Sequence, residues 1–324
     1  EAGVQVCLNT FLTGTMTDGA WIEGLIAGSH AGREAIRASA FVDCTGYGDL
    51  AAHAGADYVE PNDYPVANSI GVGGVDVEGY HRFLESHDAV QHYCEGMRNG
   101  QEGQIVRLQA RPGNLPPEFN EEMRKIGMAS VITTTRDDYF MFLKLNYKMP
   151  ASPTDRDEAA KAELELRKRQ AKAIELLRKW VPGCEKAFIA RTSPSLCIRR
   201  GRLITCDYDI SLADVLEGRH FEDDVMAYGF HDSAPRLQIK DGGTYGIPYK
   251  SLRPVGVDNL LVAGMLITAD HDAHMSTRNT VSCMAQGQAV GTAAALCAAQ
   301  SCGTRDLVYA DLRAALEEGG VYFE

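Results

Sequence analysis

The clearest pattern of apolar and polar positions lies between Asp258 and Leu296. A short apolar run over residues 260–263 is bounded by polar residues and ends at Gly264, which predicts a strand buried on both faces. A polar loop follows, and from about Thr280 a helical pattern begins, with small residues at spacings of four: Ala285, Ala289 and Ala293. The N-terminus of this helix would suit an anionic or electron-rich ligand, and an ordinary α/β core unit is the alternative.

Three runs of strand character lie in the first part of the chain, at residues 3–8, 21–27 and 35–42. The turns between them contain Asp18-Gly19 and residues 29–32, which suit hairpins, so we expect a small antiparallel meander. The third run leads into a turn that contains Thr45, Gly46 and Gly48, and a short helix over residues 50–54 follows. Two glycines around one residue either let the backbone approach a ligand or form a plain left-handed turn.

The middle of the chain predicts a second region of helices and strands. Residues 77–98 and 153–181 are expected to be helical, and Ser152 is the expected cap of the second helix. Residues 130–135 and 139–146 have the β-branched and aromatic composition of a second sheet. The glycine cluster at residues 71–74 is expected to be a strand with a bulge rather than a dinucleotide-binding loop.

Three arginines lie within four positions of a predicted strand over residues 193–204: Arg199, Arg200 and Arg202. Arginine binds carboxylates and phosphates bidentately, so the segment is a candidate substrate or cofactor contact. Ion pairs with three nearby carboxylates are the alternative: Asp207, Asp209 and Asp214.

The composition restricts the possible binding partners and the cellular compartment of the protein. Among 324 residues, 44 are acidic and 32 are basic, and no Lys/Arg-rich block occurs, so we expect no nucleic-acid partner and no anionic membrane surface. No apolar segment approaches the ~20 residues that a membrane-spanning helix needs. The nine cysteines include no C-x-x-C pair, which favours reduced thiols and a cytoplasmic protein. Since the first residue is Glu1, we expect further residues ahead of it in the natural chain.

Three segments occur in an order that resembles a known family: FVDCTGYGDLAAHAGADY, IRRGRLITCDYDISLADVLEGRHFEDDV, and YGIPYKSLRPVGVDNLLVAGMLITADHDAHMSTRN with CMAQGQAVGTAAAL after it. They resemble the FAD-dependent oxidoreductases whose flavin domain is similar to that of glutathione reductase and fumarate reductase. The resemblance implies an α/β fold, with a discontinuous FAD-binding Rossmann-like domain over residues 1–58 and 241–300. It also implies an inserted α+β substrate domain over residues 59–240, with a C-terminal helix over residues 301–324.

The resemblance also assigns contacts to the cofactor, FAD. Thr45, Gly46 and Gly48 match the family's second nucleotide-contacting strand end. Gly264 and Met265 would lie by the ribityl and pyrophosphate part of the flavin. The residues expected to face the isoalloxazine ring are Arg278, Asn279, Thr280, Ser282 and Cys283. A helix N-terminus beside the ring would stabilise the negative charge that a flavin acquires on reduction.

One expected element is not found in the sequence. Family members begin with a βαβ unit that carries G-x-G-x-x-G and holds the ADP half of FAD, and nothing before Thr45 matches it. We therefore expect the chain to be a fragment, or one part of a split protein completed by an N-terminal polypeptide. On this interpretation the chain alone binds FAD weakly or not at all.

The candidate chemistry lies in the loop over residues 270–278. His271 or His274 could act as the acid/base, with Arg278 holding the substrate or a flavin oxygen. Both histidines could instead hydrogen-bond to the loop backbone. The two histidines and their neighbouring aspartates show no distant third ligand, so no metal is expected.

Two functional hypotheses follow from these features. The first is an FAD-dependent oxidoreductase that transfers hydride or electrons between a small polar metabolite and flavin. The second is a non-catalytic subunit or fragment that completes a flavoprotein only with a partner chain. An oligomer is compatible with either hypothesis.

Overall fold

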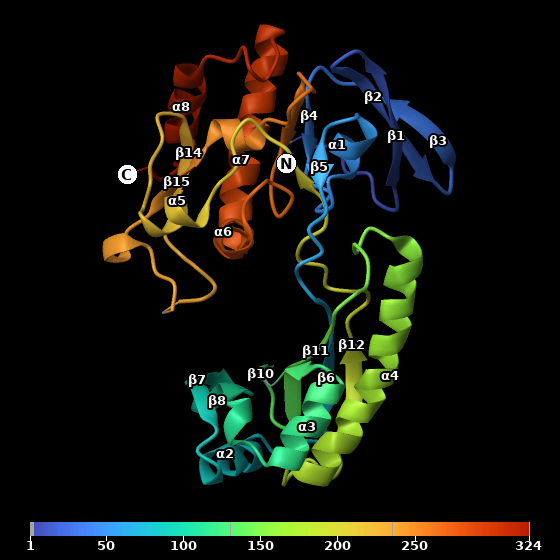
Figure 1. Cartoon of the computed structure of the whole chain (residues 1–324), viewed down its shortest axis with the longest axis vertical. Helices are drawn as coiled ribbons and strands as arrows, with labels where there is room; N and C mark the ends of the chain where they lie inside the picture. Colours follow the sequence, from blue (N-terminus) through green and yellow to red (C-terminus); the bar gives the residue numbers. More distant parts are fainter. Residues whose placement is uncertain (1–2, 130, 235, 324) are drawn as a thin grey trace. The chain divides into compact units, whose positions relative to one another are not determined.

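The computed structural model describes residues 3–129, 131–234 and 236–323, and the chain divides into two compact units (Figure 1). The first unit comprises Glu1–Asp63 and Arg200–Glu324, and the second comprises Tyr64–Arg199. The expected mixed α/β class is confirmed, while the predicted domain boundaries at residues 58, 240 and 300 stay a prediction. Among the described residues, no helix combines the length and the apolar character needed to cross a membrane.

The first unit opens with the expected antiparallel meander. Its strands, in the order β1-β2-β3, are β1 Phe11–Asp18, β2 Trp21–Ser29 and β3 Gly32–Ile36. The predicted strand over residues 3–8 is wrong, because no described strand hydrogen-bonds to this segment. Val4, Val6 and Leu8 instead remain 72–78% exposed. An alternating pattern forms a strand only where a neighbouring strand completes the ladder.

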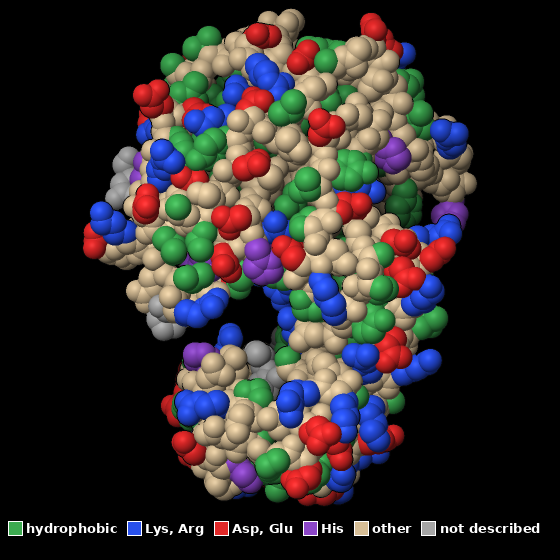
Figure 2. Space-filling view, in the orientation of Figure 1, with side chains coloured by type: hydrophobic (Ala, Val, Ile, Leu, Met, Phe, Trp, Pro, Cys, Tyr) green, Lys and Arg blue, Asp and Glu red, His purple; other side chains and the backbone are tan. Residues whose placement is uncertain are grey.

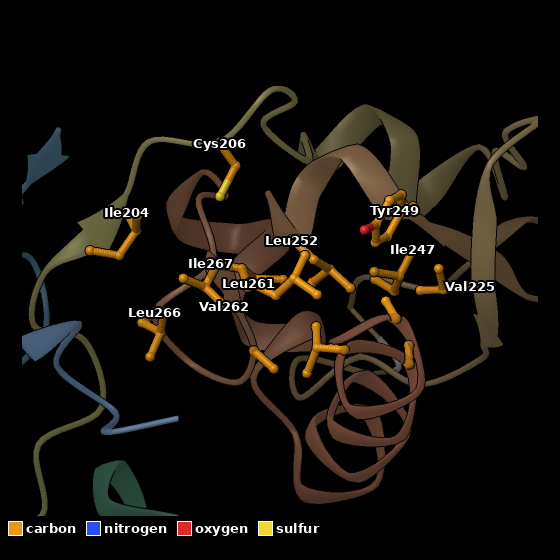
Figure 3. Packing of buried hydrophobic residues seen from close by; sticks show 14 of the residues in the cluster. Ile204, Cys206, Val225, Ile247, Tyr249, Leu252, Leu261, Val262, Leu266 and Ile267 are labelled. Atoms are coloured by element: carbon orange, nitrogen blue, oxygen red, sulfur yellow. The ribbon is translucent and has the colours of Figure 1, made fainter. Parts of the chain in front are cut away.

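A short parallel pair forms the centre of the first unit. Strand β4 (Phe41–Asp43) pairs with β16 (Leu260–Val262), and Val262 lies opposite Asp43. The predicted run over 35–42 therefore divides between β3 and β4. All three residues of β16 are buried, as a strand covered on both faces requires. Figure 3 shows Leu261 and Val262 packed in the core of this unit.

Helices follow both strands of the pair. Helix α1 (Asp49–His53) follows β4, and α7 (Thr280–Gln300) follows β16 as expected. The predicted loop between Gly264 and α7 contains a further helix, α6 (His271–Thr277). Its start is fixed by the carboxylate of Asp270, which accepts a hydrogen bond from Ala273 N at 2.8 Å.

Short elements complete the first unit. They are β5 Tyr58–Val59, β13 Leu203–Ile204, α5 Leu212–Leu216, β14 Asp224–Tyr228, the 3-10 turns Lys240–Gly242 and Tyr249–Leu252, β15 Tyr245–Pro248, and α8 Tyr309–Glu318. The predicted strand over residues 193–204 is reduced to β13. Arg200 lies just ahead of it and is buried, and its guanidinium donates to the carbonyls of Ala269 and Asp270, so side-chain contacts rather than a ladder set this segment.

The second unit contains two antiparallel sheets. One has the order β12-β6-β11-β9, from β12 Phe188–Thr192, β6 Val66–Gly73, β11 Tyr139–Tyr147 and β9 Met128–Ala129. The other has the order β10-β8-β7, from β10 Val131–Thr133, β8 Gln101–Ala110 and β7 Val90–Arg98. The predicted second sheet and the strand at the glycine cluster are confirmed, and Ser130 lies outside the described residues.

Four helical segments accompany these sheets: α2 Val77–Ser86, the 3-10 turn Pro112–Asn114, α3 Pro117–Lys125 and α4 Arg156–Trp180. The predicted helix over residues 77–98 is correct only to Ser86. Beyond it, β7 and β8 form a hairpin around Asn99-Gly100, both at positive φ, a turn signal that outweighed the helical pattern. Asp155, rather than Ser152, caps α4, because its carboxylate accepts from the N–H groups of Asp157 and Glu158.

Charged side chains of both signs are interspersed on the face shown in Figure 2. Along α4, Glu163 pairs with Arg167 and Glu165 pairs with Arg169, each four residues apart. Pairs at this spacing stabilise a helix by roughly 0.2–0.5 kcal/mol each.

Candidate functional site

Two turns from distant parts of the sequence meet at the ends of the parallel pair. Gly46 follows β4 with a φ of 82°, and Gly264 follows β16 with a φ of 96°. A Cβ added at Gly46 would lie 3.0 Å from the Met265 Cε atom, so the two turns are in contact. Both glycines have the left-handed conformation that other residues rarely adopt. The structure thus brings together three of the predicted cofactor residues: Gly46, Gly264 and Met265.

The first turn is held by Asp43, a residue that the sequence did not single out. Its carboxylate is fully buried and accepts from Thr45 N at 2.9 Å, from Thr45 Oγ1 at 2.7 Å and from Ala51 N at 2.9 Å. Thr45 Oγ1 in turn accepts from Asp49 N. The predicted contact residue Thr45 therefore shapes the turn, and Gly48, which precedes α1, packs its backbone against Ile204.

The second turn is held by Gln286 of α7, which sequence reasoning also missed. Its Oε1 accepts from Gly264 N at 2.8 Å, while its Nε2 donates to Thr277 O at 2.8 Å and to Ser282 Oγ at 3.0 Å. The side chain is fully buried. One amide therefore joins the turn after β16, the end of α6 and the first turn of α7. The signal available in the sequence was a glutamine within a helix that is otherwise lined with small residues.

His274 is fully buried and faces the same turn. Its Nε2 lies 2.9 Å from the Met265 carbonyl oxygen, an acceptor only, so this nitrogen carries the proton. Burial lowers the pKa of His274 to about 3, and the nearby Arg200 and Arg278 add to the effect. This histidine is therefore neutral at physiological pH and fixes the conformation of the backbone.

His271 has a different environment. Its side chain is 44% exposed, and its Nδ1 lies 2.9 Å from Asp63 Oδ2. Asp63 also lies 3.4 Å from Arg200 Nε. A carboxylate beside Nδ1 selects the tautomer in which Nε2 is the basic nitrogen. The structure therefore separates the two candidate histidines into one that is oriented at the surface and one that is buried.

The arginines of this region are engaged with the protein itself. Arg278 pairs with Asp232, and its side chain is 12% exposed. Arg202 donates to Tyr47 O at 3.2 Å and to Asp49 Oδ1 at 2.8 Å, which ties it to the first turn. Arg200 and Arg202 do form the ion pairs given as the alternative, but the carboxylates come from residues 63 and 49 rather than from the three aspartates named from the sequence.

The start of α7 carries the remaining predicted contacts. Asn279 is the N-cap, and its side chain makes no capping bond among the described residues; its Nδ2 donates to Met275 O instead. Thr280 is exposed and Ser282 is buried. The Cys283 thiol donates to Arg278 O at 3.2 Å, and burial raises its pKa, so it is a poor nucleophile.

Two features indicate room for a ligand beside these groups. A Cβ added at Gly264 would meet no described atom within 4 Å. Thr277 is fully buried, and among the described residues its Oγ1 has no hydrogen-bond partner. The Thr277 hydroxyl and the free N–H groups at the uncapped start of α7 are hydrogen-bond donors that fit an electron-rich ring system. In the part of the chain that the structure describes, no cluster of His, Cys, Asp and Glu could hold a metal ion.

A family model described as FAD dependent oxidoreductase matches residues 1–316. No curated protein matches the chain. Solved structures similar to it include a geranylgeranyl bacteriochlorophyll reductase-like protein from Thermoplasma acidophilum, with 10% identity, a TM-score of 0.39, and coverage of 95% of this chain and 52% of that one.

Two further structures are a p-nitrophenol 4-monooxygenase from Pseudomonas putida DLL-E4 and a pyridoxine 4-oxidase from Mesorbium loti. The first has 10% identity, a TM-score of 0.35, and coverage of 96% of this chain and 50% of that one. The second has 10% identity, a TM-score of 0.23, and coverage of 86% and 55%. The chain thus spans about half the length of each structure.

Proposed function

Because the chain belongs to the FAD dependent oxidoreductase family, we propose that its first unit holds the flavin-ring half of FAD and transfers reducing equivalents to or from a small polar metabolite. The observation that carries this proposal is the meeting of two glycine turns with the uncapped start of α7 at the ends of the β4–β16 pair. On this proposal the flavin domain is discontinuous and Rossmann-like, with the 64–199 unit inserted between its two segments.

The residues that would hold the cofactor are those of the two turns and of the helix start. Backbone groups at Gly46 and Gly264 would approach it closely, since neither carries a side chain, and the Met265 backbone adjoins Gly264. The Thr277 hydroxyl and the first N–H groups of α7 would donate to it. FAD, when bound, supplies the hydride or electron acceptor that no side chain can provide.

His271 is the proposed acid/base. Asp63 accepts from Nδ1, so Nε2 can take a proton from a substrate hydroxyl or amine and return it in the reverse direction. His274 is assigned a positioning role, because its Nε2–H is committed to the Met265 carbonyl. Arg278 is paired with Asp232, and it would act on a substrate only together with that carboxylate.

The cofactor site is tested by titrating FAD into the protein and following the visible flavin spectrum. Gln286→Ala should weaken binding on the order of tenfold or more, because it releases the Gly264 turn. Gln288→Ala is the matched control, since Gln288 lies on the same helix but bonds to Gly319 O. Equal FAD affinity in both variants would contradict this site.

The proton-transfer role is tested by anaerobic mixing of the flavin-loaded protein with small hydroxy and amino compounds. His271→Gln should slow flavin reduction by ~10² or more and leave FAD affinity unchanged. His30→Gln, in the turn between β2 and β3, is the control. An unchanged reduction rate in His271→Gln would remove this residue from the mechanism.

A second function is supported by the other edge of β4. Among the described residues β4 pairs only with β16, and two-stranded parallel sheets are uncommon because such sheets are normally covered and extended. Val281 and Met284 of α7 are also 66% and 70% exposed. We propose as the alternative that a partner polypeptide with a G-x-G-x-x-G βαβ unit adds a parallel strand here and completes the flavoprotein.

Co-expression separates the two proposals. A partner-dependent protein should co-elute with a G-x-G-x-x-G polypeptide in gel filtration and carry flavin only in that complex. The replacement Met284→Lys should then weaken the complex, while Lys125→Gln in the other unit should leave it intact. Stoichiometric flavin on the chain alone would contradict the alternative and support the first proposal.

A further inference from the structure

A second candidate ligand site lies wholly within the 64–199 unit. Strand β6, between β11 and β12 in the sheet (Figure 1), contributes Gly73 to its floor, and Gly71 lies two residues before it on the same strand. A Cβ added at Gly71 would collide with the Tyr139 hydroxyl and lie 2.5 Å from Arg191 Cγ. A Cβ added at Gly73 would lie 2.6 Å from the Phe188 ring. These glycines therefore let two aromatic side chains and an arginine stem lie flat on the sheet.

Both neighbouring strands are irregular next to this floor. The register of β12 on β6 shifts between Ile189 and Arg191, and that of β11 on β6 shifts between Phe140 and Leu143. β-Bulges re-aim side chains and are frequent beside binding sites. Here the irregularity places Ala190 and Arg191 together in the lining of one hollow.

The hollow has a volume of about 450 Å³, which is in the range that small-molecule ligands occupy. Besides the floor, its lining includes Phe188, Tyr139, Arg136 and Arg191. Phe188 is 51% exposed although it is a large apolar side chain. An exposed aromatic ring beside guanidinium groups is a surface on which a planar ligand can stack.

The charges of the lining favour an anion. No described carboxylate lies within 4.0 Å of the guanidinium of Arg136 or Arg191, whereas Arg98 of the same unit pairs with Glu78 and Asp137. Asp138 also lines the hollow, so the two arginines leave an excess of one positive charge. Two guanidinium groups can bind one carboxylate or phosphate with several charge-assisted hydrogen bonds.

We propose that this hollow binds an aromatic compound that carries a carboxylate or phosphate group. The arginines hold the anion, Phe188 stacks on the ring, and the glycine floor gives the ring room. The site uses none of the residues assigned to the flavin or to proton transfer. The proposal can therefore be tested independently of that function.

Isothermal titration of the intact chain with benzoate tests the proposal, with benzyl alcohol as the neutral analogue and phenyl phosphate as the second anion. Benzoate or phenyl phosphate should bind saturably, and benzyl alcohol should not. Arg136→Gln and Arg191→Gln should each weaken the binding on the order of tenfold. Arg124→Gln, an exposed arginine of α3 outside the hollow, should leave it unchanged.

The aromatic contact has its own readout. Phe188→Ala should reduce the affinity for benzoate more than that for acetate, because only benzoate uses the ring. Circular dichroism and thermal melting show whether each variant is folded. Saturable binding of phenyl phosphate alone would assign a phosphate-bearing ligand to the site. The proposal is overturned if neither anion binds saturably, or if the Arg136→Gln/Arg191→Gln double variant binds as tightly as the unmodified chain.

Discussion

The two units use buried polar groups in different ways. In the first unit, buried side chains bond to the backbone: Asp43 to the turn and helix that follow it, Asn259 to Ile22 of β2, and Gln286 to Gly264. In the second unit the buried polar side chains mainly contact other side chains: Gln170 donates to Asn68, and Arg98 pairs with Glu78 and Asp137. Buried side chains therefore hold the backbone of the proposed ligand contacts in the first unit, whereas those of the second unit mainly hold one another.

The largest change in the free energy of unfolding is expected from a substitution in the apolar core of the second unit. Phe140 is fully buried and its ring lies 5.4 Å from that of Tyr80. Phe140→Ala should lower the free energy of unfolding of this unit by about 3–5 kcal/mol, through lost burial and the cavity left behind. Hydrogen exchange of the β11 amides measures it. Unchanged protection would show that this core does not stabilise the sheet.

A smaller but still large effect is expected at Asp43 in the first unit. Asp43→Ala removes the acceptor of three hydrogen bonds and leaves the buried Ala51 N–H without it, at a cost of roughly 3 kcal/mol. Exchange of the Ala51 amide should accelerate. Asp43→Asn keeps one carbonyl oxygen and should lose less. If both variants are equally stable, the turn does not depend on this carboxylate.

The next effect depends on pH and concerns His274. The folded state keeps this histidine neutral, with a pKa of about 3 against 6.5 when unperturbed. Its contribution to stability is complete above pH 6.5 and is lost as pH falls toward 3, because the unfolded chain takes up the proton first. The expected slope is about 1.4 kcal/mol per pH unit.

Chemical denaturation across that pH range measures the slope. His274→Gln can still donate to the Met265 carbonyl and should remove it, whereas His271→Gln, at a half-exposed position, should leave it in place. A slope that persists in His274→Gln would assign it to another group.

The smallest effect is expected at an exposed ion pair of the second unit. Lys125 and Glu121 are four residues apart on α3, and both side chains are more than half exposed. Lys125→Gln should leave the denaturation midpoint unchanged within error, because water and salt screen such pairs. A clear loss of stability would mean that this exposed pair stabilises the unit despite screening.

Much of the first unit was predictable because its signals are local. Apolar runs predicted β16 and α7, and turn residues predicted the hairpin turns of the meander, although its first strand is β1 rather than residues 3–8. The errors occur where a distant partner decided the outcome. Residues 3–8 alternate as a strand does, yet no described strand pairs with them, and residues 90–98 became a strand because β8 folds back on them.

In the candidate site, too, local signals were predictable and contacts between distant segments were not. The sequence by itself determined the two glycine turns and the helix that follows Gly264, since backbone freedom and helical periodicity are properties of a local segment. Only the tertiary structure decided which histidine is exposed. Asp63 reaches His271 across 208 positions, while burial and the Met265 carbonyl keep His274 neutral. Hydrogen-bond partners and desolvation depend on the packing of remote segments, and no local pattern encodes them.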